Sequence, residues 1–311
     1  MRKTAWAILA AATIGALALS GCSAPAASDD GRVQVVASTN VYGDIAATVG
    51  GDRVAVRSLI DSVAKDPHSY EASARDMLYV SRADLLIENG GGYDAFMDDL
   101  RGDADAPVVT AFDFSGQAED DDGHADAHDG HGHSHLEGVN EHVWFDVHTM
   151  IHVVEQIEKD LSRIDKAGAA EYAKNADALI ADLEGVEKEI DVLHEKLEGT
   201  PVLITEPLPG LLAASAGLDD VTPDGFAAAV EEGNDVPPAT LLAAVRLIDD
   251  GKVDAVLSTV QTEGAETVRL EKAAKDAGIP VIRFSELLEP DQSYSEWMRA
   301  AVQSLSEALT A

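Results

Sequence analysis

The feature that most constrains the fold of this 311-residue chain is an apolar stripe near its centre. The stripe residues follow one another at alternating intervals of four and three: Tyr172, Ala176, Leu179, Leu183, Val186, Ile190, Leu193 and Leu197. This spacing places them along one face of an α-helix of about seven turns. A coiled coil shows the same spacing. Because the chain has a single such segment and strand patterns flank it, we predict one long linking helix at 166–198 that lies across two lobes.

Strand-like and helix-like patterns alternate on both sides of this helix. Apolar and β-branched runs predict strands at 33–38, 54–60, 83–88, 108–112, 201–205, 253–259 and 279–284. Helical patterns lie at 42–49, 72–82, 208–216, 238–249, 263–277 and 294–309. The helix at 238 should not begin earlier, because Pro237 disfavours helical geometry at Val236 while Pro238 suits a first helical position. Such alternation predicts an α/β fold with two lobes, at 33–165 and 199–311, each a parallel sheet flanked by helices.

The first residues have the order of an export signal. A basic start is followed by an apolar stretch from Ala5 to Leu19 and then by Leu-Ser-Gly-Cys, which resembles a bacterial lipobox. An ordinary signal peptide or a short membrane anchor is the alternative, but the stretch is shorter than the roughly 20 residues that a span needs. We predict that residues 1–21 are removed, that Cys22 is lipidated, and that 22–32 form a flexible tether. The protein would then be extracytoplasmic and lipid-anchored to the bacterial cell membrane.

Composition excludes several functional classes. Lys and Arg number 22 against 57 Asp and Glu, for a net charge of −35, so the chain lacks the basic surface of a nucleic-acid binder. A single cysteine excludes an internal disulfide framework and a cysteine-rich zinc site. The chain also lacks the HExxH motif, a nucleophile elbow and a glycine-rich phosphate loop. We therefore do not expect an enzyme.

Residues 119–135 interrupt the α/β pattern with the sequence EDDDGHADAHDGHGHSH. Histidines lie among acids and glycines without apolar periodicity, at His124, His128, His131, His133 and His135. This composition predicts a disordered, metal-binding loop with weak auxiliary sites. The alternative is a solvated tether with no effect on metal uptake.

Four residues are candidate metal ligands at the ends of predicted elements. His68 follows the strand at 54–60, and the carboxyl ends of parallel strands are where α/β folds place ligands. His142 lies beside an aromatic pair just after the histidine-rich segment. Glu206 and Glu286 each follow a strand of the second lobe. For each of them the alternative is a structural or surface residue.

A further pair, His148 and His152, has i,i+4 spacing where helical character returns near Thr149. Two histidines at this spacing lie on one helix face and can bind a metal ion by themselves.

Taken in order, the short motifs resemble the metal-binding substrate-binding lipoproteins of ABC importers for zinc and manganese, the cluster A-I type (solute-binding protein family 9). The resemblance covers nearly the whole mature chain. It rests on ASTNVYGDI, DPHSYE, ADLLIENGG, NEHVWFD, the long helix and YSEWM, at 37–45, 66–71, 83–91, 140–146, 172–197 and 294–298.

The resemblance implies a bilobal fold joined by one long helix, with small lobe movement and a single metal ion between the lobes. His68 and His142 match the family's two ligands from the first lobe. Glu206 matches the third position, which is often His in zinc binders and Glu in manganese binders. Glu286 matches the fourth, a carboxylate after a late strand, for which Glu289 and Asp291 are nearby alternatives.

Two imidazoles and two carboxylates fit tetrahedral zinc, and the affinity order also favours zinc over manganese. We therefore expect capture of Zn²⁺, with Mn²⁺ as the alternative, and delivery to an ABC permease driven by its ATPase. We expect a monomer. Two other functions remain open: an extracellular zinc hydrolase, with Glu71 or Glu141 as general base, and a metal buffer that works without a transporter.

Overall fold

The computed structural model describes residues 31–310 except 64, 66, 68, 69, 103 and 118–138. Residues 32–311 form one compact unit, separate from the residues before them. Cys22, most of the predicted tether, the histidine-rich segment and His68 lie outside the described residues. Within the part of the chain that is described, no helix is both long and apolar enough to cross a bilayer.

The first half of the unit is built on a parallel sheet of four strands in the order β2-β1-β3-β4. The strands are β1 (Val33–Thr39), β2 (Val54–Ile60), β3 (Leu85–Glu88) and β4 (Val108–Thr110). The helices of this half are α1 (Asn40–Gly50), α2 (Ala74–Val80) and α3 (Phe96–Arg101). In the register, Val35 of β1 lies beside Val56 on one side and Leu85 on the other.

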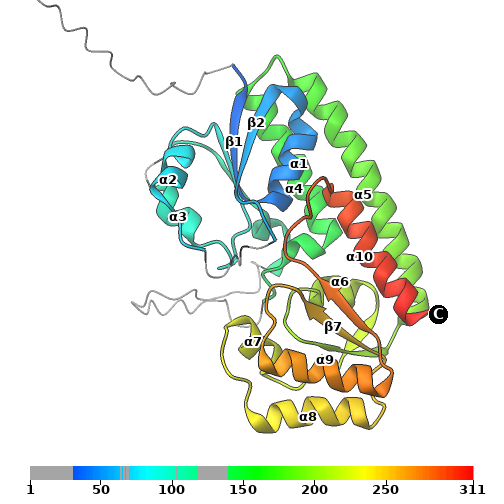
Figure 1. The fold of residues 1–311 in the computed structure, drawn as a ribbon. Helices are drawn as coiled ribbons and strands as arrows, with labels where there is room; N and C mark the ends of the chain where they lie inside the picture. Colours follow the sequence, from blue (N-terminus) through cyan, green and yellow to red (C-terminus); the bar gives the residue numbers. More distant parts are fainter. Residues whose placement is uncertain are drawn as a thin grey trace, which may run out of the picture. The chain divides into compact units, whose positions relative to one another are not determined.

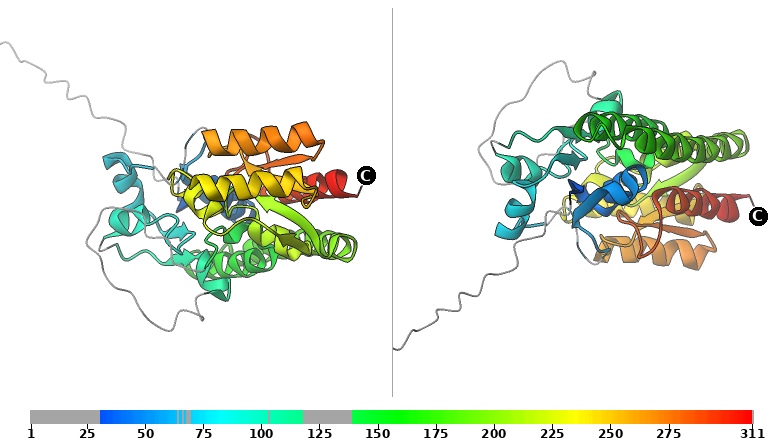
Figure 2. Two further views of the ribbon diagram at one scale, coloured as in Figure 1. Left: turned by 90° about the horizontal axis from the view of Figure 1, so that it is seen from below. Right: turned by 90° about the horizontal axis from the view of Figure 1, so that it is seen from above.

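The second half repeats this strand order as β6-β5-β7-β8, again parallel. Its strands are β5 (Thr200–Ile204), β6 (Leu218–Asp220), β7 (Ala255–Thr259) and β8 (Val281–Phe284). The helices are α6 (Gly210–Ser215), α7 (Phe226–Glu231), α8 (Pro238–Asp249) and α9 (Ala265–Ala277), and α8 and α9 lie side by side (Figure 2). In each sheet the direction in which strands are added reverses between the two central strands, β1 and β3 in the first sheet and β5 and β7 in the second. An α/β sheet opens a crevice for ligands at this position.

Three helices connect the halves. They are α4 (Val147–Ile164), α5 (Ala169–Leu197) and α10 (Tyr294–Leu309). All eight residues of the apolar stripe are buried on α5, as the spacing predicted. The C-terminal helix α10 packs along α5 (Figure 1), and Arg299 on α10 donates to the Asp182 carboxylate on α5 at 3.2 Å.

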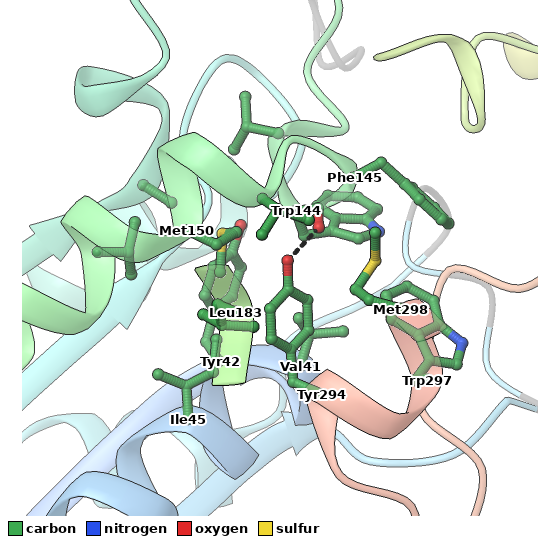
Figure 3. Close-up of a cluster of buried hydrophobic side chains, with 14 of the residues drawn as sticks. Val41, Tyr42, Ile45, Trp144, Phe145, Met150, Leu183, Tyr294, Trp297 and Met298 are labelled. Carbon is green, nitrogen blue, oxygen red and sulfur yellow. Dashed lines mark hydrogen bonds between the residues drawn. The ribbon is translucent and has the colours of Figure 1, made fainter. Parts of the chain in front are cut away.

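One hydrophobic cluster runs from the first sheet through α4, α5 and α10 to the second sheet. Figure 3 shows its aromatic centre, where Tyr294 of α10 lies between Tyr42 of α1 and Trp144. The Tyr294 hydroxyl donates to the Trp144 carbonyl at 2.7 Å. Because this core belongs to both halves and to the helices between them, it ties the two sheets into one unit.

Most predicted elements are confirmed. The strand at 54–60 and the helices at 238–249 and 294–309 have the predicted bounds. Helix α8 begins at Pro238, which the double proline required. The predicted strand at 108–112 was too long, because a 3-10 helix (Ala111–Phe114) takes over after Thr110.

Candidate metal centre

His142 lies at the base of a short 3-10 helix (Val143–Phe145) that leads into α4, and it is completely buried. Its ring stands edge-on to Trp144, with centroids 5.1 Å apart, and to Tyr93, with centroids 5.9 Å apart. The aromatic neighbours therefore limit rotation of the imidazole and exclude water from its faces.

The side chain of Asn140 fixes the orientation of His142. The Asn140 Oδ1 accepts a hydrogen bond from the His142 backbone N–H at 3.0 Å and lies 3.0 Å from its Nδ1. Because an amide oxygen only accepts, Nδ1 carries the proton in this contact, and Nε2 presents its lone pair to a ligand. This is the arrangement that orients metal-binding histidines in general.

The same amide also reaches the second half of the unit. Its Nδ2 donates to the Pro207 carbonyl at 2.9 Å, directly after Glu206. The backbone of Asn140 is held in turn by the Gln117 side chain, through hydrogen bonds of 2.8 and 2.9 Å. Asn140 therefore connects the segment of one candidate ligand to the segment of another.

Glu231, the last residue of α7, approaches His142 from the second half. Its Oε1 lies 3.5 Å from the His142 Nε2. One ligand atom each of Glu141, His142 and Glu231 lie within 4.8 Å of one another. Sequence reasoning did not nominate Glu231, because it ends a short helix rather than a strand and is one of 57 acidic residues.

Glu206 lies two residues after the end of β5 and is only 1% exposed. The hydroxyl of Thr262, in the loop after β7, donates to its Oε2. The prediction that this glutamate stands at a strand end is confirmed, and its burial distinguishes it from the surface acids of the chain.

Glu286 follows β8 and is completely buried. The Tyr93 hydroxyl, from the first half, donates to its Oε2 at 2.9 Å. Burial, followed by the neighbouring Glu286 carboxylate, raises the pKa of Tyr93 well above its usual value, so the hydroxyl keeps the proton that it donates. The alternatives Glu289 and Asp291 are exposed and line a separate hollow with Asp44.

These contacts join residues from both sheets into one buried group. Tyr93 touches the ring of His142 and donates to Glu286. The neighbouring residues Gln261 and Thr262 bond the Glu286 backbone and the Glu206 side chain. Burying several carboxylates together is costly unless protons or a cation offset their charge. A divalent cation suits this arrangement, because it would neutralise carboxylates and accept the lone pair of an imidazole.

Two of the other candidate histidines lie in the described part of the chain, and neither belongs to this group. His148 and His152 lie exposed on α4. His68 lies outside the described residues, as do the five histidines of 119–135. Their predicted roles stay predictions.

Comparison with known proteins identifies the family. Residues 35–308 match the family model ZnuA, described as the periplasmic component A of a zinc-uptake complex. The chain belongs to this family. The resemblance inferred from its motifs is thereby confirmed.

Individual relatives are more distant. The chain is 28% identical over 217 residues, 66% of each chain, to the manganese-binding lipoprotein MntA of Halalkalibacterium halodurans. It is 25% identical over 321 residues, 97% of each chain, to the manganese ABC transporter substrate-binding lipoprotein scaA of Streptococcus gordonii. The solved periplasmic zinc-binding protein TroA of Treponema pallidum superposes with a TM-score of 0.72 at 17% identity, over 90% of this chain and 99% of that one. This likeness confirms the two-lobed α/β fold.

Proposed function

We propose that this protein captures a divalent transition-metal ion between its two halves and delivers it to the permease of an ABC importer, whose ATPase drives release. The observation that carries the proposal is the buried group of His142 and carboxylates contributed by both halves, with Glu231 Oε1 3.5 Å from the His142 Nε2. The names of the relatives, lipoproteins of metal ABC transporters, support it. Lipidation at Cys22 would hold the protein at the outer face of the membrane, beside its permease.

The proposed ligands are His68, His142, Glu206 and Glu286. Asn140 and Tyr93 would hold two of these ligands in position without binding the ion themselves. Asn140 accepts from the His142 imidazole, and Tyr93 donates to the Glu286 carboxylate. Glu231 lies close enough to His142 to join these ligands when an ion is bound.

We propose zinc as the ion. Zinc accepts mixed nitrogen and oxygen ligands in tetrahedral sites, and the general affinity order places it above manganese. The histidine-rich segment would add weak, exchangeable zinc sites.

Manganese is a second candidate, favoured by one specific observation. A glutamate, Glu206, stands where the family's zinc binders often have His, and Glu231 brings another carboxylate to the imidazole. Carboxylates suit manganese better than they suit zinc. The relatives MntA and scaA are named for manganese.

The test is metal content and competition on the lipid-free chain from Ser23 onward. Zinc and manganese are offered together to the intact chain, to a 119–135 deletion, and to His142→Ala and Glu206→Ala. One tight zinc ion per chain that survives the deletion and weakens in both point variants supports the proposal. Tight binding of manganese in the presence of zinc would instead support a role in manganese uptake. Loss of all tight binding on deletion of 119–135 alone refutes the buried site.

The matched control is His194→Ala. His194 lies on α5, exposed, with its Nδ1 2.8 Å from the Ser215 carbonyl. Its replacement should leave tight binding unchanged, which shows that losses in the other variants come from the site.

A further inference from the structure

Two histidines stand together on the exposed surface of α4, outside the candidate metal centre. His148 and His152 are one helical turn apart, and their ring centroids are 5.0 Å apart with planes at 85°. Their side chains are 72% and 43% exposed. Both rings therefore project from the same face of the helix and are open to ions in solution.

A carboxylate backs each imidazole. The Nδ1 of His148 lies 3.2 Å from the Glu187 Oε1 on α5, and the Nδ1 of His152 lies 3.1 Å from the Glu155 Oε2 on α4. A carboxylate that accepts from Nδ1 leaves the lone pair on Nε2. Carboxylate–histidine pairs of this kind fix the tautomer and the ring orientation of metal-binding imidazoles. In both rings the Nε2 lone pair is therefore directed away from the carboxylate and can bind a metal ion.

The backbone beneath the pair is well anchored. Asp146 caps α4, where its side chain accepts from the His148 N–H at 3.1 Å and from the Thr149 hydroxyl at 2.6 Å. A hollow of about 360 Å³ beside His148 is lined by Asp146, Glu187 and Asp191 among others. The surrounding carboxylates attract cations to this face of the helix.

We propose that His148 and His152, backed by Glu187 and Glu155, form a second, exposed site for a divalent transition metal, independent of the buried centre. Two imidazoles select ions that prefer nitrogen ligands, such as Zn²⁺, Ni²⁺ and Cu²⁺, over Mn²⁺, Mg²⁺ and Ca²⁺. Solvent completes the coordination, so the ion at this site exchanges readily.

The test isolates this site from the others. In the chain from Ser23 onward, which contains the whole compact unit, His142→Ala removes the buried centre. The histidines of the loop are replaced by asparagine: His124, His128, His131, His133 and His135. Zn²⁺ binding is then measured by titration calorimetry. Because the buried centre is absent from this background, the result does not depend on the proposed function.

We expect one Zn²⁺ site in this background. His148→Ala and His152→Ala should each weaken it by about tenfold or more, since a single imidazole cannot chelate, and Glu187→Gln should weaken it less. His194→Ala, on an exposed histidine of α5, should have no effect. Mn²⁺ should show no binding under the same conditions.

An independent readout is electron paramagnetic resonance of the chain loaded with one equivalent of Cu²⁺. The proposal requires a signal from two equatorial nitrogens that falls to one in either single variant. Equal Zn²⁺ affinity in the parent and both His variants, or a weakening as large in His194→Ala, would overturn it. The variants compared, His148→Ala, His152→Ala, Glu187→Gln and His194→Ala, change side chains at the surface and share one parent background, and circular dichroism checks that each folds like that parent.

Discussion

The Asn140 side chain makes three contacts around the proposed site, and its removal should therefore affect both metal binding and stability. It accepts from the His142 N–H and Nδ1, each at 3.0 Å, and donates to the Pro207 carbonyl at 2.9 Å. At about 1 kcal/mol net for each hydrogen bond, Asn140→Ala should lower the free energy of unfolding by about 2–3 kcal/mol. Loss of the Nδ1 contact should also weaken metal affinity by about 10–100-fold, since such supporting contacts have effects of that size.

Asn140→Asp separates the two effects. The carboxylate still accepts from the His142 N–H and Nδ1 but cannot donate to Pro207. We therefore expect metal affinity within about threefold of the parent, because the imidazole stays oriented. Stability should fall by more than the about 1 kcal/mol of the lost hydrogen bond, because the new carboxylate also faces the Pro207 carbonyl oxygen.

The matched control is Asn175→Ala. The Asn175 Nδ2 donates to the Val49 carbonyl at 3.1 Å, so this amide also joins two segments, but at α5 and α1. Its loss should lower stability without changing affinity. The assays are competition with a zinc-binding fluorescent chelator, and urea unfolding of the metal-free chain.

Two results would refute the reasoning. If Asn140→Ala binds zinc as tightly as the parent, the Nδ1 contact does not orient a ligand. If Asn140→Asp loses as much affinity as Asn140→Ala, the contact with Pro207, rather than the imidazole, controls binding.

Further predictions concern a ligand contact, a buried acid and the long helix. Tyr93→Phe removes the hydroxyl that donates to a candidate ligand and should weaken metal affinity about tenfold. Tyr172→Phe, whose hydroxyl donates to Asp165 instead, should leave affinity unchanged in the same chelator competition. Burial raises the pKa of Glu88 to about 7. A raised pKa means that the native state favours the protonated form, so stability is fully present below about pH 4.5 and declines as pH rises to about 7. The decline should reach at most about 3 kcal/mol, and urea unfolding across this range should show a smaller one in Glu88→Gln. Leu183→Ala, at a fully buried stripe position, should lower the unfolding free energy by about 2–5 kcal/mol. Val192→Ala on the exposed face of the same helix should change it by less than about 0.5 kcal/mol in parallel urea titrations.

Elements with a long, regular pattern could be predicted from the sequence. The stripe on α5 repeats over many turns, and a helix places all eight of its residues on one buried face. The elements that were missed are short: β6 has three residues, and α3 and α7 have six each. Such segments hold too few apolar positions to show a period, and tertiary packing determines their conformation.

The residues of the candidate site also fall into those that the sequence could nominate and those that only the fold brings together. Glu206 and Glu286 could be nominated because each lies just past the end of an apolar strand, and strand ends of a parallel sheet gather at one edge. His142 could be nominated from its aromatic neighbours and the family motif. The family motif already favoured Glu286 over Glu289 and Asp291, and the fold adds that Glu286 is buried whereas the other two are exposed.

What the sequence alone determined about this protein is therefore what depends on neighbours along the chain: periodic helices, buried strands, residues that follow strand ends, and an ordered set of motifs. The tertiary structure decided which groups from distant segments meet. Glu231 lies at His142, Tyr93 donates to Glu286, and Asn140 reaches Pro207 only because the two halves pack on α4, α5 and α10. Such contacts leave no local pattern, because they depend on the packing of the whole core rather than on the spacing of residues in one segment.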